Sequence, residues 1–133
     1  MSVGSRRQAR ERALSLLYEA DAKGASPSAV IAELPVEAEP FVVDMVEGVE
    51  EHLDRIDALL EKHSIGWTLD RMAVIDRTLL RMAVYELLES PDVPVGAIVS
   101  EAVELAKRFS TEDSGRFVNG ILSAIASEVR PRG

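Results

Sequence analysis

Cysteine is absent from this sequence of 133 residues, and histidine occurs only twice. The lack of cysteine excludes disulfides, thiolate catalysis and cysteine-ligated zinc, and it suits a reducing cytosol, so we expect a cytoplasmic protein. His52 and His63 are eleven residues apart. On one helix this spacing is about 16 Å, at roughly 1.5 Å per residue, which is too far for the two rings to share a metal. We therefore expect no metal site.

Long apolar runs and the common catalytic motifs are missing as well. No stretch approaches the roughly 20 apolar residues of a membrane-spanning helix, and the N-terminus has no apolar signal segment. There is no glycine-rich phosphate loop, no Glu-x-x-His pair and no setting for a Ser-His-Asp triad. The many carboxylates recur at intervals typical of a solvated helix face. These absences predict a protein that is not an enzyme, binds no cofactor and does not enter a membrane.

The charges that are present are distributed unevenly. The net charge of −8 argues against a general nucleic-acid coat protein. Residues 1–12 nevertheless hold four arginines and one glutamate, a local charge of +3, while residues 33–61 hold ten acids and one base. An acidic protein with one basic end can bind a polyanion only in a defined place and orientation.

The basic end belongs to a predicted helix over residues 5–23. Its apolar stripe recurs at spacings of three and four and consists of Ala9, Ala13, Leu16, Leu17 and Ala20. At about 100° per residue, Arg6 and Arg10 fall on the same side as this stripe, with Arg7 next to them. Unpaired arginines are costly to bury. Either the helix start extends beyond the body of the protein, which is the arrangement we expect, or acidic residues beneath it pair with the arginines.

Helical periodicity continues through the rest of the chain. Further helices are predicted over residues 27–34, 41–63, 72–89, 95–109 and 112–129, with tails at 1–4 and 130–133. Ser26 and Thr111 are expected to cap two of these helices, and Gly24 to end the first. The helix over 72–89 is apolar around much of its girth, which is typical of a central helix packed on several sides.

No strand is predicted, so the fold class is all-α. We expect a compact helical bundle of about six or seven helices that forms a single domain over residues 1–133. Its two halves, about 5–63 and 68–129, are expected to share one core.

Three segments together resemble the NusB family of bacterial transcription antitermination factors. They are RQARERAL (7–14) with residues 17–18, IDRTLLRMAVYEL (75–87) with DVP (92–94), and EAVELAKRF (101–109) with EDS (112–114) and FVNGIL (117–122). Each segment alone is weak, but all three in order cover nearly the whole chain. The resemblance implies an all-helical protein that binds single-stranded boxA RNA of ribosomal RNA leader transcripts with the ribosomal protein NusE. It also implies assembly with other Nus factors and RNA polymerase, and suppression of premature termination in ribosomal RNA operons.

The resemblance also implies roles for particular residues. Seven residues are expected to form the RNA-binding surface: Arg6, Arg7, Arg10, Lys107, Asp113, Ser114 and Phe117. The arginines would contact phosphates, Phe117 would stack on a base, and Asp113 would weaken binding by repelling phosphate. Asp76 matches an acidic position at the surface that faces NusE, which is basic. Gln8 stands where another arginine is common in the family, so the affinity for RNA is expected to be lower.

Each of these residues also has a purely structural interpretation. The arginines could form a solubilising helix start, Phe117 could belong to the core, and Asp113 could favour the N-terminus of its helix. Asp76 could pair with a neighbour one turn away on the surface.

Two other functions remain open. A NusB-like domain also precedes the catalytic domain of ribosomal RNA cytosine methyltransferases, although no cofactor-binding α/β domain follows here before Gly133. The chain could instead be a self-associating interaction module, since family members can be monomers or homodimers.

Overall fold

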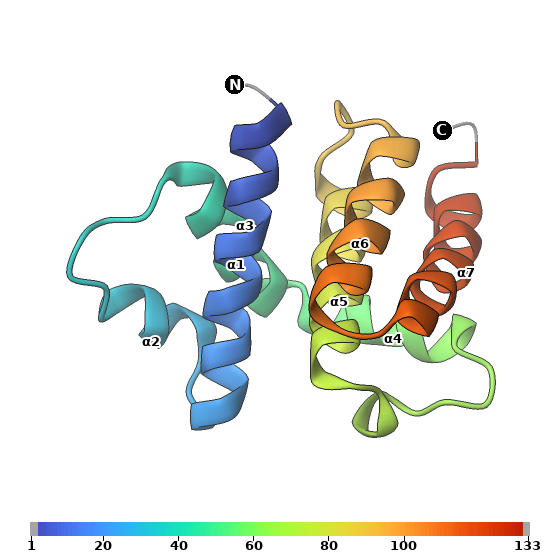
Figure 1. The fold of residues 1–133 in the computed structure, drawn as a ribbon, viewed down its shortest axis with the longest axis horizontal. Helices are drawn as coiled ribbons and strands as arrows, with labels where there is room; N and C mark the ends of the chain where they lie inside the picture. The colour runs from blue at the N-terminus through green and yellow to red at the C-terminus, as the bar shows by residue number, and fades with distance from the viewer. Residues whose placement is uncertain (1–2, 132–133) are drawn as a thin grey trace.

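The helical periodicity of the sequence corresponds to seven α-helices in the computed structural model of the protein, which describes residues 3–131 (Figure 1). They are α1 (Val3–Lys23), α2 (Pro27–Ala32), α3 (Pro40–Glu51), α4 (Leu53–His63), α5 (Val74–Glu89), α6 (Val95–Phe109) and α7 (Glu112–Val129), with a 3-10 turn η1 (Leu69–Arg71) before α5. No strand occurs within residues 3–131, so the all-α prediction is confirmed. No helix in this range is both long and apolar enough to cross a bilayer.

The predicted single helix over residues 41–63 is wrong, because the chain bends at His52 between α3 and α4. The backbone of His52 leaves helical geometry, with φ −102° and ψ 15°. Its ring Nδ1 lies 3.0 Å from the carbonyl oxygen of Gly48, and the ring packs against Tyr85 of α5. The bend lets the two segments pack on different neighbours: α3 contacts α1, α2 and α5, whereas α4 packs mainly on α5 and α7.

Helix α5 is the centre of the molecule, as its apolar girth predicted. It contacts α1, α3, α4, α6 and α7. In Figure 1, α1, α2 and α3 lie to the left of α5, α6 passes in front of it, and α7 lies to the right. The buried apolar side chains form one continuous core to which all seven helices, α1–α7, contribute. The proposed halves, 5–63 and 68–129, stay a prediction about folding units.

Local capping signals account for the helix ends next to the site. Thr111 Oγ1 accepts the backbone N–H of Ser114 at 3.1 Å, and Ser114 Oγ accepts the N–H of Thr111 at 3.3 Å. This reciprocal capping box fixes the start of α7. Ser26 caps α2 as predicted, and Gly24 leaves α1 with φ of 63°. The start of α7 therefore has a defined geometry that also orients the side chain of Ser114.

The predicted end of the last helix at residue 129 agrees with α7, and the first residue of the predicted tail, Arg130, is held in place. The guanidinium of Arg130 donates hydrogen bonds to the backbone carbonyls of Glu86, Leu87, Ser90 and Val93. These carbonyls surround the end of α5, where the last turn of a helix lacks partners for its own carbonyl groups. Arg130 thus ties the end of α7 to the end of α5. Residues 1–2 and 132–133 of the predicted tails lie outside the described residues.

Candidate nucleic-acid interface

The first part of the predicted RNA surface is the arginine end of α1, and its innermost member is Arg10. Its side chain is buried, with 6% of the residue exposed. Nε and Nη2 each donate to one carboxylate oxygen of Glu86 at 2.8 Å, and Nη1 lies 3.9 Å from Glu101. Burial lowers the pKa of Arg10, but the bonds and charge of Glu86 outweigh it and raise the pKa overall. Acidic residues therefore lie beneath α1, and the expected overhang is wrong at Arg10.

Arg7 is also paired with a carboxylate, but it remains partly exposed to solvent. Its Nε and Nη2 donate to the two carboxylate oxygens of Glu101 at 3.1 and 2.7 Å, while 44% of its side chain stays exposed. The bonds from Arg7 lower the pKa of Glu101 against the opposing effect of burial. Arg7 can therefore meet a ligand without leaving its partner on α6.

Arg6 lies over an aromatic ring. Its guanidinium carbon is 4.1 Å from the centroid of the Phe41 ring, a distance at which a cation is attracted to the ring face. Its Nε is buried without a hydrogen-bond partner among the described residues. The start of α3 thus supports Arg6 through an aromatic ring, whereas α5 and α6 hold Arg10 and Arg7 through carboxylates.

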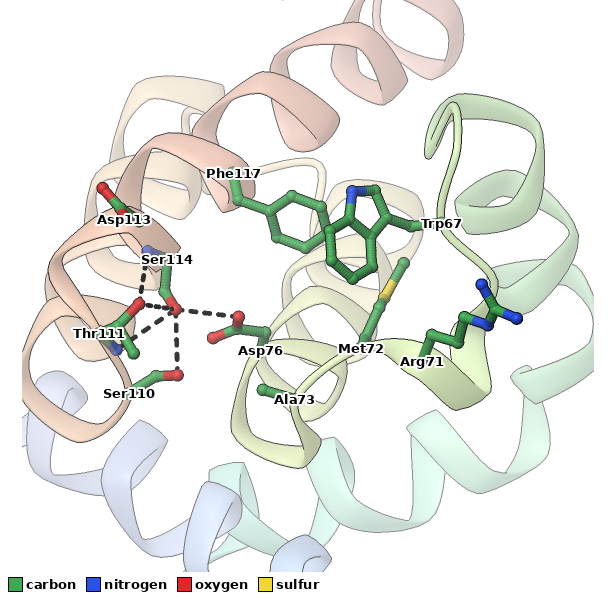
Figure 2. A pocket seen from close by; sticks show the side chains of 10 residues that line it. All are labelled: Trp67, Arg71, Met72, Ala73, Asp76, Ser110, Thr111, Asp113, Ser114 and Phe117. Atoms are coloured by element: carbon green, nitrogen blue, oxygen red, sulfur yellow. Dashed lines mark hydrogen bonds between the residues drawn. The ribbon is translucent and has the colours of Figure 1, made fainter.

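The second part of the predicted surface is a pocket of about 470 Å³ between η1, α5 and the start of α7 (Figure 2). It brings together Asp76, Asp113, Ser114 and Phe117. The expected surface position of Asp76 is wrong, because only 7% of this residue is exposed. It lies instead beside the residues expected to touch RNA, so two sites that the sequence treated separately meet in one place.

Ser114 connects the capping box to this pocket. Its hydroxyl donates to Asp76 Oδ2 at 2.9 Å, and the hydroxyls of Thr111 and Ser110 lie 2.9 and 3.0 Å from it. A hydroxyl has one proton and two acceptor positions. Since that proton is given to Asp76, Ser114 can accept hydrogen bonds from its neighbours. The cap of α7 therefore holds the Asp76 carboxyl group in place.

Trp67 is the largest of the pocket residues that the sequence did not single out for binding; the others are Arg71, Met72, Ala73, Ser110 and Thr111. Its indole is 52% exposed, and it meets the Phe117 ring edge to face with centroids 5.9 Å apart and planes at 70°. Figure 2 shows both rings on the side of the pocket opposite Ser110 and Thr111. The available signal was the only tryptophan of the chain, placed in a helix break.

Lys107 lies beside the pocket rather than in its wall. Its stem covers Gly115, where an added Cβ would come within 3.0 Å of the Lys107 Cγ and Cε atoms. Arg7 pairs with Glu101 in the middle of α6, whereas the pocket is lined by Ser110 and Thr111, just beyond the end of this helix. Arg108 pairs with Glu11 between them. Seven residues separate Glu101 from Arg108, which is about 10 Å along the helix.

Comparison with known proteins identifies the family. The sequence model of the NusB family matches residues 7–127. The chain belongs to the NusB family. Two relatives are both named transcription antitermination protein NusB. The protein from Thermobifida fusca is 49% identical, covering 92% of this chain and 89% of its own, and that from Kineococcus radiotolerans is 47% identical, covering 93% and 94%.

Solved NusB structures share the fold. T. maritima NusB superposes with a TM-score of 0.82 at 36% identity, covering 92% of this chain and 91% of its own. A NusB chain crystallised with NusE and double-stranded RNA has a TM-score of 0.80 at 30% identity, covering 96% and 99%. These matches confirm the predicted resemblance. Membership of a family whose curated relatives are named for antitermination also confirms that the chain is not an enzyme.

The candidate interface contains no cluster of side chains typical of a metal centre. Within the described residues, no group of three or more His, Cys, Asp or Glu side chains could hold an ion. The chemistry available is thus cationic at α1, apolar and aromatic at Trp67 and Phe117, and hydrogen-bonding at Asp76 and Ser114.

Proposed function

We propose that this protein is an RNA-binding transcription antitermination factor. It binds the boxA element of ribosomal RNA leader transcripts together with NusE and promotes processive transcription of ribosomal RNA operons in the cytoplasm. The observation that carries the proposal is an exposed cation beside the middle of α6 and an aromatic-lined pocket just beyond its end in a member of the NusB family. One solved NusB relative forms a complex with NusE and RNA.

The contacts of the three arginines suggest different roles for them. Arg7 is half exposed and can hold a phosphate with the outer part of its guanidinium. For Arg10 to reach a phosphate, it would have to leave both oxygens of Glu86 and strand a buried carboxylate. We therefore assign Arg10 to fixing α1, and Arg7, supported by Arg6, to binding the RNA backbone.

The remaining predicted residues divide between the pocket and its rim. Phe117 offers a face on which a base stacks, and Ser114 supplies a hydroxyl. Lys107 attracts phosphates next to the pocket, whereas the exposed Asp113 repels them and limits affinity. Single-stranded RNA lying along α6 would reach both ends of this surface.

Partner proteins need a different surface from the one first expected. Asp76 is too buried to meet NusE directly. The acidic stretch over residues 33–61 keeps most of its carboxylates exposed, and this surface suits a basic partner such as NusE. Other Nus factors and RNA polymerase would join the complex on the transcribing enzyme, and self-association into a homodimer is a further property to measure.

The test is a salt titration of binding to single-stranded boxA RNA, with and without NusE. Three or four phosphate contacts imply a log–log slope of about −2 to −3, at roughly −0.7 per contact. Arg7→Ala should weaken binding and flatten the slope by about 0.7. Arg55→Ala removes the same charge from an exposed site on α4 and should leave the slope unchanged. Salt-independent binding, or equal affinity for a scrambled RNA, would refute the proposal.

A further inference from the structure

The Asp76 carboxyl group has one oxygen that nothing in the described structure satisfies. Oδ2 accepts the hydroxyl of Ser114 at 2.9 Å, but Oδ1 is buried without a hydrogen-bond partner. Buried carboxyl oxygens are nearly always paired, because burying them unpaired is unfavourable. The unpaired oxygen belongs to a residue that lines the pocket of about 470 Å³. Oδ1 itself is shielded from solvent, so a ligand has to approach Asp76 closely to supply the missing hydrogen bond.

The two sides of this pocket have different chemistry. Trp67, Met72 and Phe117 supply apolar and aromatic surface on one side (Figure 2). The opposite side carries Asp76 and the hydroxyl groups around Ser114. A matching ligand needs a flat apolar face and an edge that donates hydrogen bonds. Such a division is typical of pockets that stack an unpaired base and read its Watson–Crick edge.

The charge of the pocket disfavours a phosphate as its occupant. Asp76, Asp113 and Arg71 all line it, so a phosphate would meet two carboxyl groups and only one guanidinium. Among the bases, guanine places two N–H donors side by side, at N1 and at the exocyclic N2. Uracil flanks its single N–H with two carbonyl oxygens, which would face the carboxyl oxygens of Asp76. The acceptor at Oδ1 thus favours guanine over uracil.

We propose that the pocket between Trp67, Phe117 and Asp76 binds one unstacked guanine of the RNA, with Asp76 as the residue that sets base specificity. Asp76 accepts hydrogen bonds from the guanine edge, and Trp67 and Phe117 pack against the ring. The proposal rests on the proposed RNA-binding function and specifies how that site selects sequence. It also replaces the expected contact between Asp76 and NusE.

The experiment uses the fluorescence of Trp67 to detect binding in the pocket, because Trp67 is the only tryptophan in the chain. Short RNAs of uridines carry guanosine, inosine or uridine at one central position; inosine differs from guanosine only by lacking the N2 amine. The guanosine RNA should quench Trp67 fluorescence and bind about fivefold or more tightly than the other two, the effect of leaving a polar group unpaired. Asp76→Asn keeps an oxygen for Ser114 but presents an N–H₂ group to the donors of guanine, so it should remove this preference.

Two further variants separate base reading from charge and from folding. Asp113→Asn removes the same charge at the exposed rim of the pocket. It should strengthen binding of all three RNAs and leave the ratio between guanosine and inosine unchanged. Trp67→Ala changes a half-exposed side chain, so this variant should fold normally. It should bind the guanosine RNA more weakly, as measured by fluorescence anisotropy of labelled RNA. Trp67→Phe, which keeps an aromatic ring, should restore the binding. Circular dichroism would verify that each variant is folded.

Three outcomes would overturn the assignment. Equal binding of guanosine and inosine RNAs, or a preference that persists in Asp76→Asn, would remove Asp76 as the specificity residue. If RNA binds in an Arg7-dependent way without affecting Trp67 fluorescence, the pocket is not the base site, while the proposed RNA-binding function stands. A response of Trp67 to NusE alone would assign the pocket to a protein side chain. If no RNA binds at all, both proposals fail together.

Discussion

The arginine end of α1 and the pocket at the start of α7 handle buried charge in opposite ways. At α1, the Arg10 guanidinium is matched by both oxygens of Glu86 and approached by Glu101. In the pocket, the Asp76 carboxyl group has one partnered oxygen and one without a partner. The sequence suggested a cationic site at α1 and an exposed acidic surface facing NusE at residue 76. The structure shows that a charge counted in the sequence is available to a ligand only where the fold leaves it exposed, as at Arg7, or without a full set of partners, as at Asp76.

The largest expected effect is the loss of the matched pair. Arg10→Ala leaves the buried Glu86 carboxylate without its main partner, which should lower the free energy of unfolding by about 3–5 kcal/mol. Chemical denaturation monitored by circular dichroism would measure it. The double variant Arg10→Met/Glu86→Leu removes both charges and should recover most of the stability. If Arg10→Ala unfolds like the unchanged protein, Arg10 is not held by Glu86 in solution.

Removing the single partner of Asp76 should have a smaller effect. Ser114→Ala deletes the hydroxyl that donates to Oδ2 and also opens the capping box of α7. A stability loss of about 1–3 kcal/mol is expected from a buried oxygen left unpaired and a weakened cap. Denaturation should be compared with Ser123→Ala, a change at an exposed serine further along α7. Equal stability of the two variants would mean that Asp76 does not depend on Ser114.

The loss of stability at acidic pH should show whether Arg7 pairs with Glu101. Arg7 holds the pKa of Glu101 below its ordinary value of 4.5. Because the folded pKa is depressed, the contribution of Glu101 is complete above pH 4.5 and is lost as the pH falls through the lower folded value. Arg7→Ala should therefore move acid unfolding toward higher pH and leave stability at pH 7 less affected than Arg10→Ala does. An unchanged acid transition, followed by circular dichroism between pH 2 and 6, would argue that the pair does not form.

The smallest stability effect is expected at Trp67. Half of its surface is exposed, so Trp67→Ala should change the free energy of unfolding by no more than about 1 kcal/mol, with most of the loss arising from the contact with Phe117. The measurement compares the thermal unfolding of Trp67→Ala with that of Phe117→Ala. The Phe117 side chain packs more fully against the core. A larger loss for Trp67→Ala than for Phe117→Ala would assign Trp67 to the core instead of the pocket.

Local signals explain which helices could be predicted. The bounds 95–109 and 112–129 agree with α6 and α7 because Pro94 precedes one and Thr111 caps the other, so the information lies within a few residues. The bend at His52 could not be read in this way. It depends on the packing of His52 against Tyr85, and the apolar spacing continues through it without interruption.

The candidate site shows the same difference between local signals, which the sequence contains, and contacts between distant residues, which it does not reveal. Periodicity placed Arg10 on the apolar side of α1, but its partner Glu86 is 76 residues further along the chain. Asp76 and Ser114 were both singled out by resemblance, yet their hydrogen bond joins residues 38 apart. Trp67 was passed over because a residue in a helix break has no periodic signal. Individual residues could thus be nominated from the sequence, whereas their pairing required the fold.

Glu86 is the position where the two ends of the described chain meet. Its carboxylate is bound by Arg10 of the first helix, and its backbone carbonyl by Arg130, just beyond the last helix. A single residue of the central helix therefore connects the basic end of α1 with the C-terminal end of α7. A truncation that removes Arg130 would therefore take away a contact to the same residue that holds Arg10 on the first helix.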